Sequence, residues 1–300
     1  MLNNLSNMLN NGLRSLKTGI VNRFKLFNPW DYVLLSTTTL LPFFVATPIN
    51  PILITGITWF TIGTVILLPR GVSIPTKIPD SPYQDRVSRI VEDIFNEAVV
   101  NNKPIHLPDH VILNNSNSNN ISAEALITDS RKKLLKINGN ISQLSDEELE
   151  MLISHELAHF HFKDPVAQDY STRIFWTSML LGLFYVENYF LLTAAFCATQ
   201  FLISQASNRY REYRADHYAT INHENDTQGD PRKIKDLTDL VDFLHRENSI
   251  EPNHNGNFID QVGHYCLHAY RHPETLKDKV ANTCLHLLSS HPSPLYRTKR

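Results

Sequence analysis

The amino-acid sequence predicts a mostly helical α+β protein with two transmembrane helical hairpins. Three observations support this fold class. Two long apolar runs without charge precede residue 70, a well-marked helix spans 144–164, and short segments before that helix have the character of strands. The predicted organisation is an N-terminal segment at 1–30, a hairpin at 31–70, and a main domain at 71–300 that a second apolar hairpin interrupts at about 174–204.

The composition argues against two classes of protein. A net charge of −2 leaves no basic excess to pair with phosphates, so no nucleic-acid partner is expected. The three cysteines are far apart and lack C-x-x-C spacing, which argues against a disulfide framework and a cysteine zinc site. The length of 300 residues suits one domain with appendages or two small domains.

The first 28 residues have the pattern of a cationic amphipathic helix. Large apolar residues recur at spacings of three and four from Leu2 to Phe27, with basic but no acidic residues between them. We favour a helix on an anionic membrane surface, because a membrane signal follows at once. The alternatives are a transit-peptide-like segment and a helix that packs on the folded domain.

The first apolar hairpin is predicted from two runs without a charged residue, Tyr32 to Thr47 and Ile52 to Leu68. Each run is near the lower limit of about 17 residues for crossing a bilayer. The alternative is a buried helical hairpin in a soluble protein. Lysine and arginine flank the pair only at its outer ends, so the positive-inside rule places both ends in the cytoplasm.

The stretch between the hairpin and the marked helix combines a helix with strands. Apolar residues at helical spacing predict a helix over Tyr83 to Val100, and Ile105 to Leu113 has the character of a strand. Ala123 to Thr128 and Lys133 to Asn138 form a predicted hairpin, in which Ala125 to Ile127 suits an edge strand. That edge either holds a peptide substrate in extended form or is merely structural.

The marked helix begins with strong local signals. Ser145 and Glu148 have the spacing of a capping box, in which each side chain bonds the other residue's backbone N–H. Leu144 and Leu149 occupy the two positions of a hydrophobic staple. Two independent signals therefore predict that the helix starts here.

That helix carries the H-E-x-x-H pattern of zinc hydrolases. His155 and His159 are four residues apart, so both imidazoles face one ion, and Glu156 between them can act as a base on water. Burying these groups among apolar neighbours is costly unless a metal or a hydrogen-bond network accepts them. Two core histidines with a solvent-facing glutamate are the alternative. His161 lies about 200° round the helix from His159 and is expected in packing or on the surface.

A second apolar hairpin is predicted beyond this helix. Its arms are Ile174 to Val186 and Tyr189 to Ile203, and each is short for a full span, so a re-entrant hairpin is an alternative. Basic residues again flank the pair at its outer ends. The helix with the two histidines is therefore predicted to lie on the cytoplasmic side.

A catalytic zinc usually has a third protein ligand, which must come from elsewhere in the chain. Glu212 and Asp216 stand four residues apart on a predicted helix, so they share a face. One can bind the ion while the other holds a ligand histidine. The alternative is an ordinary helix in which both carboxylates pair with nearby arginines.

These motifs together resemble a protein family. The chain looks like the membrane zinc metalloproteases that include HtpX and the CAAX prenyl proteases. Four motifs carry this resemblance: the sequence from Leu144 through His-Glu-Leu-Ala-His, Lys163-Asp164, Arg-Glu-Tyr-Arg-Ala-Asp at 211–216, and the final His291-Pro-Ser-Pro-Leu-Tyr-Arg297. The order and spacing of these motifs resemble HtpX most closely. Two departures are Ala158, where the family commonly has glycine, and Ser122 to Ala125, where its edge strand often has Asn-Ala.

The resemblance implies a membrane-embedded, zincin-type metalloprotease and a role for each matching residue. It implies His155, His159 and Glu212 as ligands of one Zn²⁺, Glu156 as general base, Asp216 as a carboxylate that supports a ligand, and His291 and Arg297 near the site in contact with substrate or the oxyanion.

The resemblance also implies a function and a place. The expected function is zinc-dependent endopeptidase cleavage of misfolded or damaged membrane proteins, so the expected partners are protein substrates and the lipid bilayer. The alternatives are a protease that processes one defined partner or prenylated peptide, and a non-catalytic zinc-binding membrane scaffold. A bacterial inner membrane with the active site facing the cytoplasm is predicted, with an organelle membrane as the alternative. Residues 222–256 suit a lid or a docking loop.

Overall fold

The computed structural model describes residues 25–44, 81–114, 121–128, 130–183 and 186–247. The predicted segment before residue 25, the second run of the first hairpin, His291 and Arg297 lie outside these residues. Within them the chain is a mostly helical α+β protein, which confirms this part of the predicted fold class, while the transmembrane hairpins stay a prediction. It divides into two compact units, Met1–Pro69 with Val166–Ser207, and Arg70–Pro165 with Asn208–Arg300.

The second unit contains a three-stranded sheet in the order β1-β3-β2, with β1 (His110–Asn114), β2 (Ser122–Ile127) and β3 (Lys133–Asn138). β2 runs antiparallel to β3, with Ala125 opposite Leu135, so the predicted hairpin and its edge strand are confirmed. β1 runs parallel to β3. The predicted strand from Ile105 is too long, because Pro108 has no N–H to give and the pairing with β3 begins after it.

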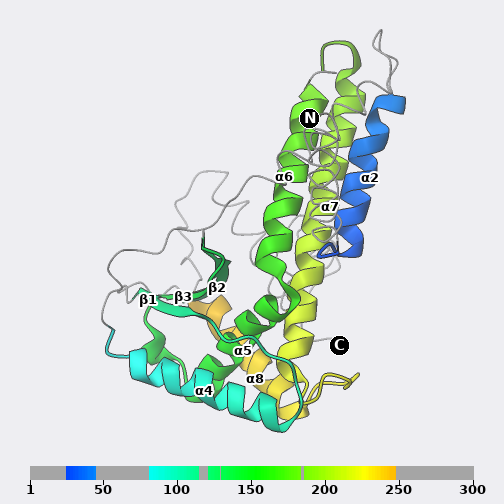
Figure 1. Ribbon diagram of the computed structural model, residues 1–300. Coiled ribbons are helices and arrows are strands. Elements are labelled where there is room, and N and C mark those ends of the chain that lie inside the picture. The colour runs from blue at the N-terminus through cyan, green and yellow to red at the C-terminus, as the bar shows by residue number, and fades with distance from the viewer. Residues whose placement is uncertain (1–24, 45–80, 115–120, 129, 184–185, 248–300) are drawn as a thin grey trace, which may run out of the picture. The chain divides into compact units, whose positions relative to one another are not determined.

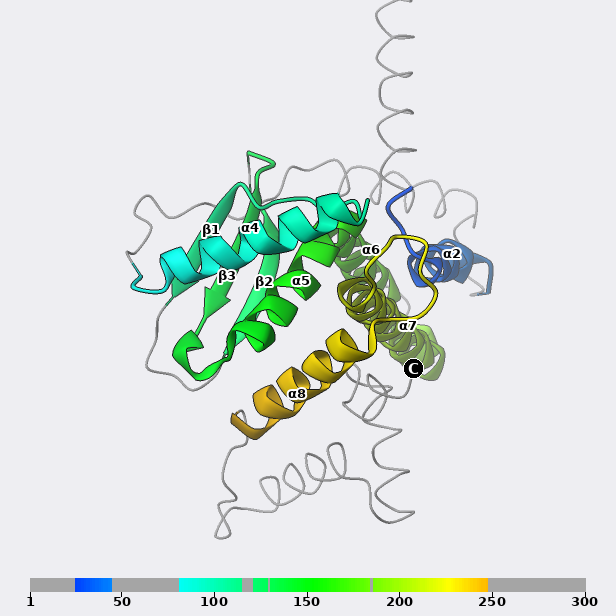
Figure 2. The ribbon, with the colours of Figure 1, turned by 90° about the horizontal axis from the view of Figure 1, so that it is seen from below.

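Three helices of the same unit form the core with the sheet: α4 (Gln84–Val100), α5 (Asp146–Phe162) and α8 (Pro231–Glu247). In Figure 1, α4 and α5 lie below the sheet, and Figure 2 shows α8 on the other side of α5 from α4. Ile90, Leu135, Leu152 and Leu240 represent the buried cluster that joins these elements. Packing against the sheet, α4 and α8 thus fixes the position of α5.

The start and end of α5 follow from local chemistry. Glu148 donates its N–H to Ser145 Oγ at 3.1 Å, and Ser145 donates its N–H to Glu148 Oε2 at 2.8 Å, so the predicted capping box is confirmed. Leu144 and Leu149 are both buried. The helix ends at Lys163, whose left-handed backbone (φ 59°, ψ 30°) turns the chain directly into the next helix.

The first unit contains α2 (Pro29–Phe44) and most of α6 (Asp164–Leu183) and α7 (Val186–Thr220). Figure 1 shows these three helices side by side, and Leu34, Ile174 and Ile203 are buried together between them. The predicted second hairpin is helical, but both arms belong to longer helices. No helix in the described part of the chain combines the length and apolar character needed to cross a membrane.

The region predicted as a lid or docking loop is described as far as residue 247. It contains a turn after Thr220 and then α8. The turn is closed by the N–H of Asp230, which donates to the carbonyl of Thr220 at 2.8 Å. Leu237, Leu240 and Val241 of α8 are buried in the core, so this helix is part of the folded unit. Residues 248–256 lie outside the described residues.

Candidate metal centre

The two histidines of α5 and one carboxylate of α7 meet in the second unit. The Nε2 atoms of His155 and His159 are 3.1 Å apart. Glu212 approaches both rings, with Oε2 3.5 Å from Nε2 of His155 and Oε1 3.7 Å from Nε2 of His159. The potential ligand atoms of all three residues lie within 4.8 Å of one another. The structure thus brings together the three side chains predicted to bind one ion.

Asp216 lies behind His155. Its Oδ1 is 2.9 Å from Nδ1 of His155, on the side of the ring away from Glu212. Since Glu212 and Asp216 are one helical turn apart on α7, they reach the two nitrogens of the same imidazole. This is the arrangement that the spacing of the two carboxylates predicted.

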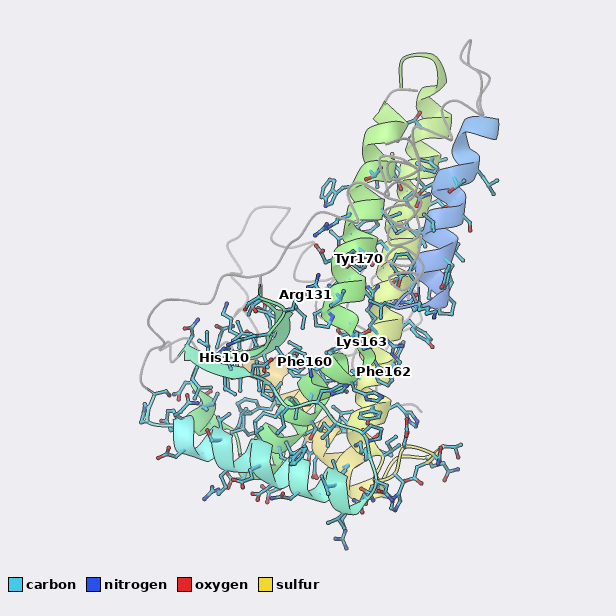
Figure 3. All side chains as sticks on the ribbon, viewed as in Figure 1. His110, Arg131, Phe160, Phe162, Lys163 and Tyr170 are labelled. Atoms are coloured by element: carbon cyan, nitrogen blue, oxygen red, sulfur yellow. The ribbon has the colours of Figure 1, made fainter. Side chains whose placement is uncertain are left out.

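Asp164 lies behind His159, and sequence reasoning assigned it no role. Its Oδ2 is 2.9 Å from Nδ1 of His159. The left-handed turn at Lys163 leads directly from α5 into α6, whose first residue is Asp164; Figure 3 labels Phe162 and Lys163, the two residues before it. The sequence feature that could have indicated this contact is the position of Asp164, directly after the helix that bears both histidines.

Each of the two aspartates contacts the Nδ1 atom of one imidazole. A carboxylate only accepts hydrogen bonds, so the Nδ1 atoms of His155 and His159 are the ones that carry hydrogen. In the neutral rings, the lone pairs are then on the two Nε2 atoms, which face each other and Glu212. Both rings are therefore oriented to donate electrons to one point.

Asp216 and Glu212 together favour a proton on His155. Burial lowers the pKa of this imidazole, but Asp216 and Glu212 outweigh that effect and raise the pKa from 6.5 to about 10. Without a metal ion, Asp216 and Glu212 therefore favour the protonated form of His155. Because a metal ligand must be the neutral imidazole, metal binding at this site must release that proton.

Glu156 lies between the two histidines on α5 and is buried, with 7% of its surface exposed. It is not one of the three residues whose ligand atoms converge. Within the described residues, no hydrogen bond or ion pair occupies its carboxylate. A carboxylate held next to a metal site and free of other partners is available to exchange a proton with water.

The donor set fits a transition metal rather than an alkaline-earth ion. Two imidazole nitrogens and one carboxylate oxygen are the ligands typical of catalytic zinc, which leaves a fourth position for water or substrate. Calcium and magnesium prefer sites made of oxygen alone. The exposed fractions of the three side chains are 9%, 12% and 16%, so the site is largely closed to bulk solvent.

A comparison with known protein families decides the class of this site. Residues 83–300 match the model described as Peptidase family M48. The chain belongs to peptidase family M48. An M48 peptidase is a metallopeptidase, a hydrolase of peptide bonds, and the match covers every residue of the metal centre.

The other comparisons add no relative. The searches of curated proteins and of solved structures found no match. The resemblance stated from the sequence motifs is therefore confirmed at the level of the M48 family, while the HtpX-like subtype stays a prediction.

His161 takes no part in the M48 metal centre. Its ring stacks on Tyr218 of α7, with centroids 4.6 Å apart and planes 13° apart, and Phe162 meets the same tyrosine edge-on. Burial lowers the pKa of His161, with the charge of His106 as the next cause. His161 is a packing residue, as predicted.

Proposed function

We propose that this M48 peptidase is a zinc-dependent endopeptidase. The convergence of His155, His159 and Glu212 on one point carries the proposal, because two histidines and a glutamate hold zinc in metallopeptidases of the thermolysin type. Zinc is the metal that this donor set suits best.

Each residue has a distinct task in the proposed reaction. His155, His159 and Glu212 would hold the ion, and Asp216 would keep the ring of His155 oriented. A bound zinc ion supplies a Lewis acid that polarises the scissile carbonyl and lowers the pKa of water towards about 7. Glu156 takes a proton from the attacking water and gives it to the leaving amine.

Removal and return of the metal test this proposal. We expect the purified protein to cleave an unfolded membrane protein, to lose that activity after dialysis against a chelator, and to regain it with about one Zn²⁺ per chain. Cleavage and metal content are measured on the same samples. Activity that survives complete removal of zinc would contradict the proposal.

The substrates we propose are misfolded or damaged membrane proteins. The motif resemblance to HtpX supports this quality-control role, and a protease for one defined partner is the second candidate because it would have the same metal site. A panel of unrelated unfolded membrane proteins separates the two. Cleavage of several favours quality control, and cleavage of one alone favours processing.

We also propose that the first unit lies in a lipid bilayer. The helices α2, α6 and α7 bury polar groups between them: Thr38 lies 2.5 Å from Ser178 through their hydroxyls, and Gln200 donates to Thr37 at 2.7 Å. Asp31, Thr38, Ser178 and Gln200 are all fully buried. A buried polar seam is typical of helices that associate in lipid, where hydrogen bonds join them.

The outward faces of the same helices support this proposal. They carry large apolar side chains with a substantial exposed fraction: Trp30 41%, Val33 41%, Leu40 48%, Trp176 61%, Phe201 37% and Leu202 41%. Water disfavours such a surface, whereas lipid chains accept it. The bacterial inner membrane, the cytoplasmic active site and the alternative organelle membrane stay predictions from charge bias alone.

Tryptophan fluorescence tests the lipid contact. The chain has three tryptophans, so replacement of Trp30 and Trp59 by phenylalanine leaves Trp176 as the only one. We expect strong quenching of Trp176 in vesicles whose acyl chains are brominated, relative to the same vesicles without bromine. The control is a chain whose only tryptophan replaces the exposed Asp146 of the second unit, and it should be quenched weakly. Equal, weak quenching of both would contradict the proposal.

A further inference from the structure

Asp164, to which the sequence motifs assigned no role, contacts one of the two histidines. Asp164 has a side chain only 3% exposed, and its two oxygens have different partners. Oδ2 accepts from Nδ1 of His159 at 2.9 Å, and Oδ1 accepts from the Nη2 group of Arg214. One carboxylate therefore joins a metal-site histidine to an arginine of α7.

Arg214 is itself held in place by packing. Its guanidinium lies over the ring of Phe162 at 4.1 Å and over the ring of Tyr210 at 5.6 Å. Arg211 adds a second positive charge, with Nε 4.0 Å from Oδ1 of Asp164. A planar guanidinium stacked on an aromatic face is a preorganised partner, so little freedom is lost when it binds the carboxylate.

We propose that Asp164 is the positioning residue for His159, and that Arg214 fixes the carboxylate in the orientation that this role requires. The proposal rests on the zinc function proposed above. Asp164 contacts Nδ1 of His159 in the same way that Asp216 contacts Nδ1 of His155. With Nδ1–H of His159 bonded to Asp164, only Nε2 is left to bind the metal, and the ring cannot turn away from Glu212.

The arrangement of the chain explains why one aspartate can do this. Asp164 follows directly on the left-handed Lys163, so its place is set by the end of α5 rather than by a flexible loop. Arg214 stands on α7 between Glu212 and Asp216, the helix that also supplies the third ligand. Loss of the Arg214 contact would release Asp164 to rotate away from His159.

The test compares the zinc affinity of the wild type, Asp164→Asn and a control, measured by competition with a chromophoric chelator. Asp164→Asn should bind zinc about 10- to 100-fold more weakly, the usual loss when the partner of a ligand histidine is removed. The visible spectrum of the Co²⁺-loaded protein should change as well. The control, Asp146→Asn, removes an exposed carboxylate that also pairs with an arginine, and should match the wild type.

A second variant keeps the test decisive if Asp164→Asn does not fold, which thermal melting of the metal-free protein will show. Arg214→Met keeps apolar contact with Phe162 but removes the guanidinium, and it should lower zinc affinity by a smaller factor. Where both variants fold, the double variant should bind about as weakly as Asp164→Asn alone, because the two residues act in one chain of contacts.

The outcomes separate this proposal from the proposed function. A wild type that takes up no zinc overturns both. A wild type that binds zinc, together with folded Asp164→Asn and Arg214→Met proteins of the same affinity and the same Co²⁺ spectrum, overturns the positioning role alone.

Discussion

Replacement of Glu156 by glutamine is expected to abolish cleavage without removing the metal. Glutamine has nearly the same size and fills the same buried position, but it cannot take a proton from water. A general base contributes about 10²- to 10⁴-fold to a rate, so the cleavage rate should fall by that factor. Zinc content should stay that of the wild type, because Glu156 is outside the convergent group of ligands.

The matched control for this prediction is Glu150→Gln. Glu150 is on the same helix and partly buried, and it lines a separate cleft with Glu97 and Lys233. Cleavage by this variant should be unchanged. If Glu156→Gln cleaves as fast as the wild type, another residue is the base. If no activity of the protein depends on Glu156, the hypothesis of a non-catalytic zinc-binding scaffold replaces that of an enzyme. Loss of zinc from Glu156→Gln would instead make Glu156 part of the ligand set.

Local sequence signals were sufficient for the elements that define the site. The capping box at Ser145 and Glu148 is a contact between residues three apart, so it can be predicted without knowledge of the rest of the fold. The spacing of His155 and His159 fixes their common face in the same way. The predicted hairpin likewise depends on residues close in sequence: β3 has the predicted bounds, and β2 lies one residue earlier than predicted.

Element lengths were predicted less well, because apolar periodicity was given more weight than helix-breaking residues. The second arm of the later hairpin was expected to end at Ile203, and Glu212 was placed on a predicted helix directly beyond it. The structure has a single 35-residue helix, α7. No glycine or proline occurs in 186–220, so nothing in the backbone ends the helix where its side chains become polar.

The role of Asp164 could not be predicted from periodicity. It depends on the left-handed conformation of Lys163, a non-glycine residue, and on the approach of Arg214 from a helix 50 residues further along the chain. Neither feature has a repeating pattern. By contrast, Asp216 was predicted because the four-residue spacing to Glu212 is itself a pattern.

Replacement of Glu212 by alanine is expected to remove both metal and activity. Two imidazole nitrogens then remain where three ligand atoms converged. The loss of zinc affinity should exceed the about 10- to 100-fold expected for Asp216→Asn, which removes only the partner of a ligand. Zinc affinity and cleavage of the two variants are compared in parallel, with Glu224→Ala as an exposed acidic control in the same unit.

Glu212 also stabilises the proton on His155, which competes with the metal ion for that ring. The direction in which zinc affinity changes in Glu212→Ala therefore distinguishes between two roles of Glu212. Glu212 is one of the two carboxylates that raise the pKa of His155 to about 10, so its removal should lower that pKa and make His155 easier to deprotonate. This change by itself favours metal binding. A large net loss of zinc would therefore mean that Glu212 acts as a ligand, since its effect on the proton has the opposite sign. Unchanged or stronger zinc binding by Glu212→Ala would mean that the third ligand is another residue.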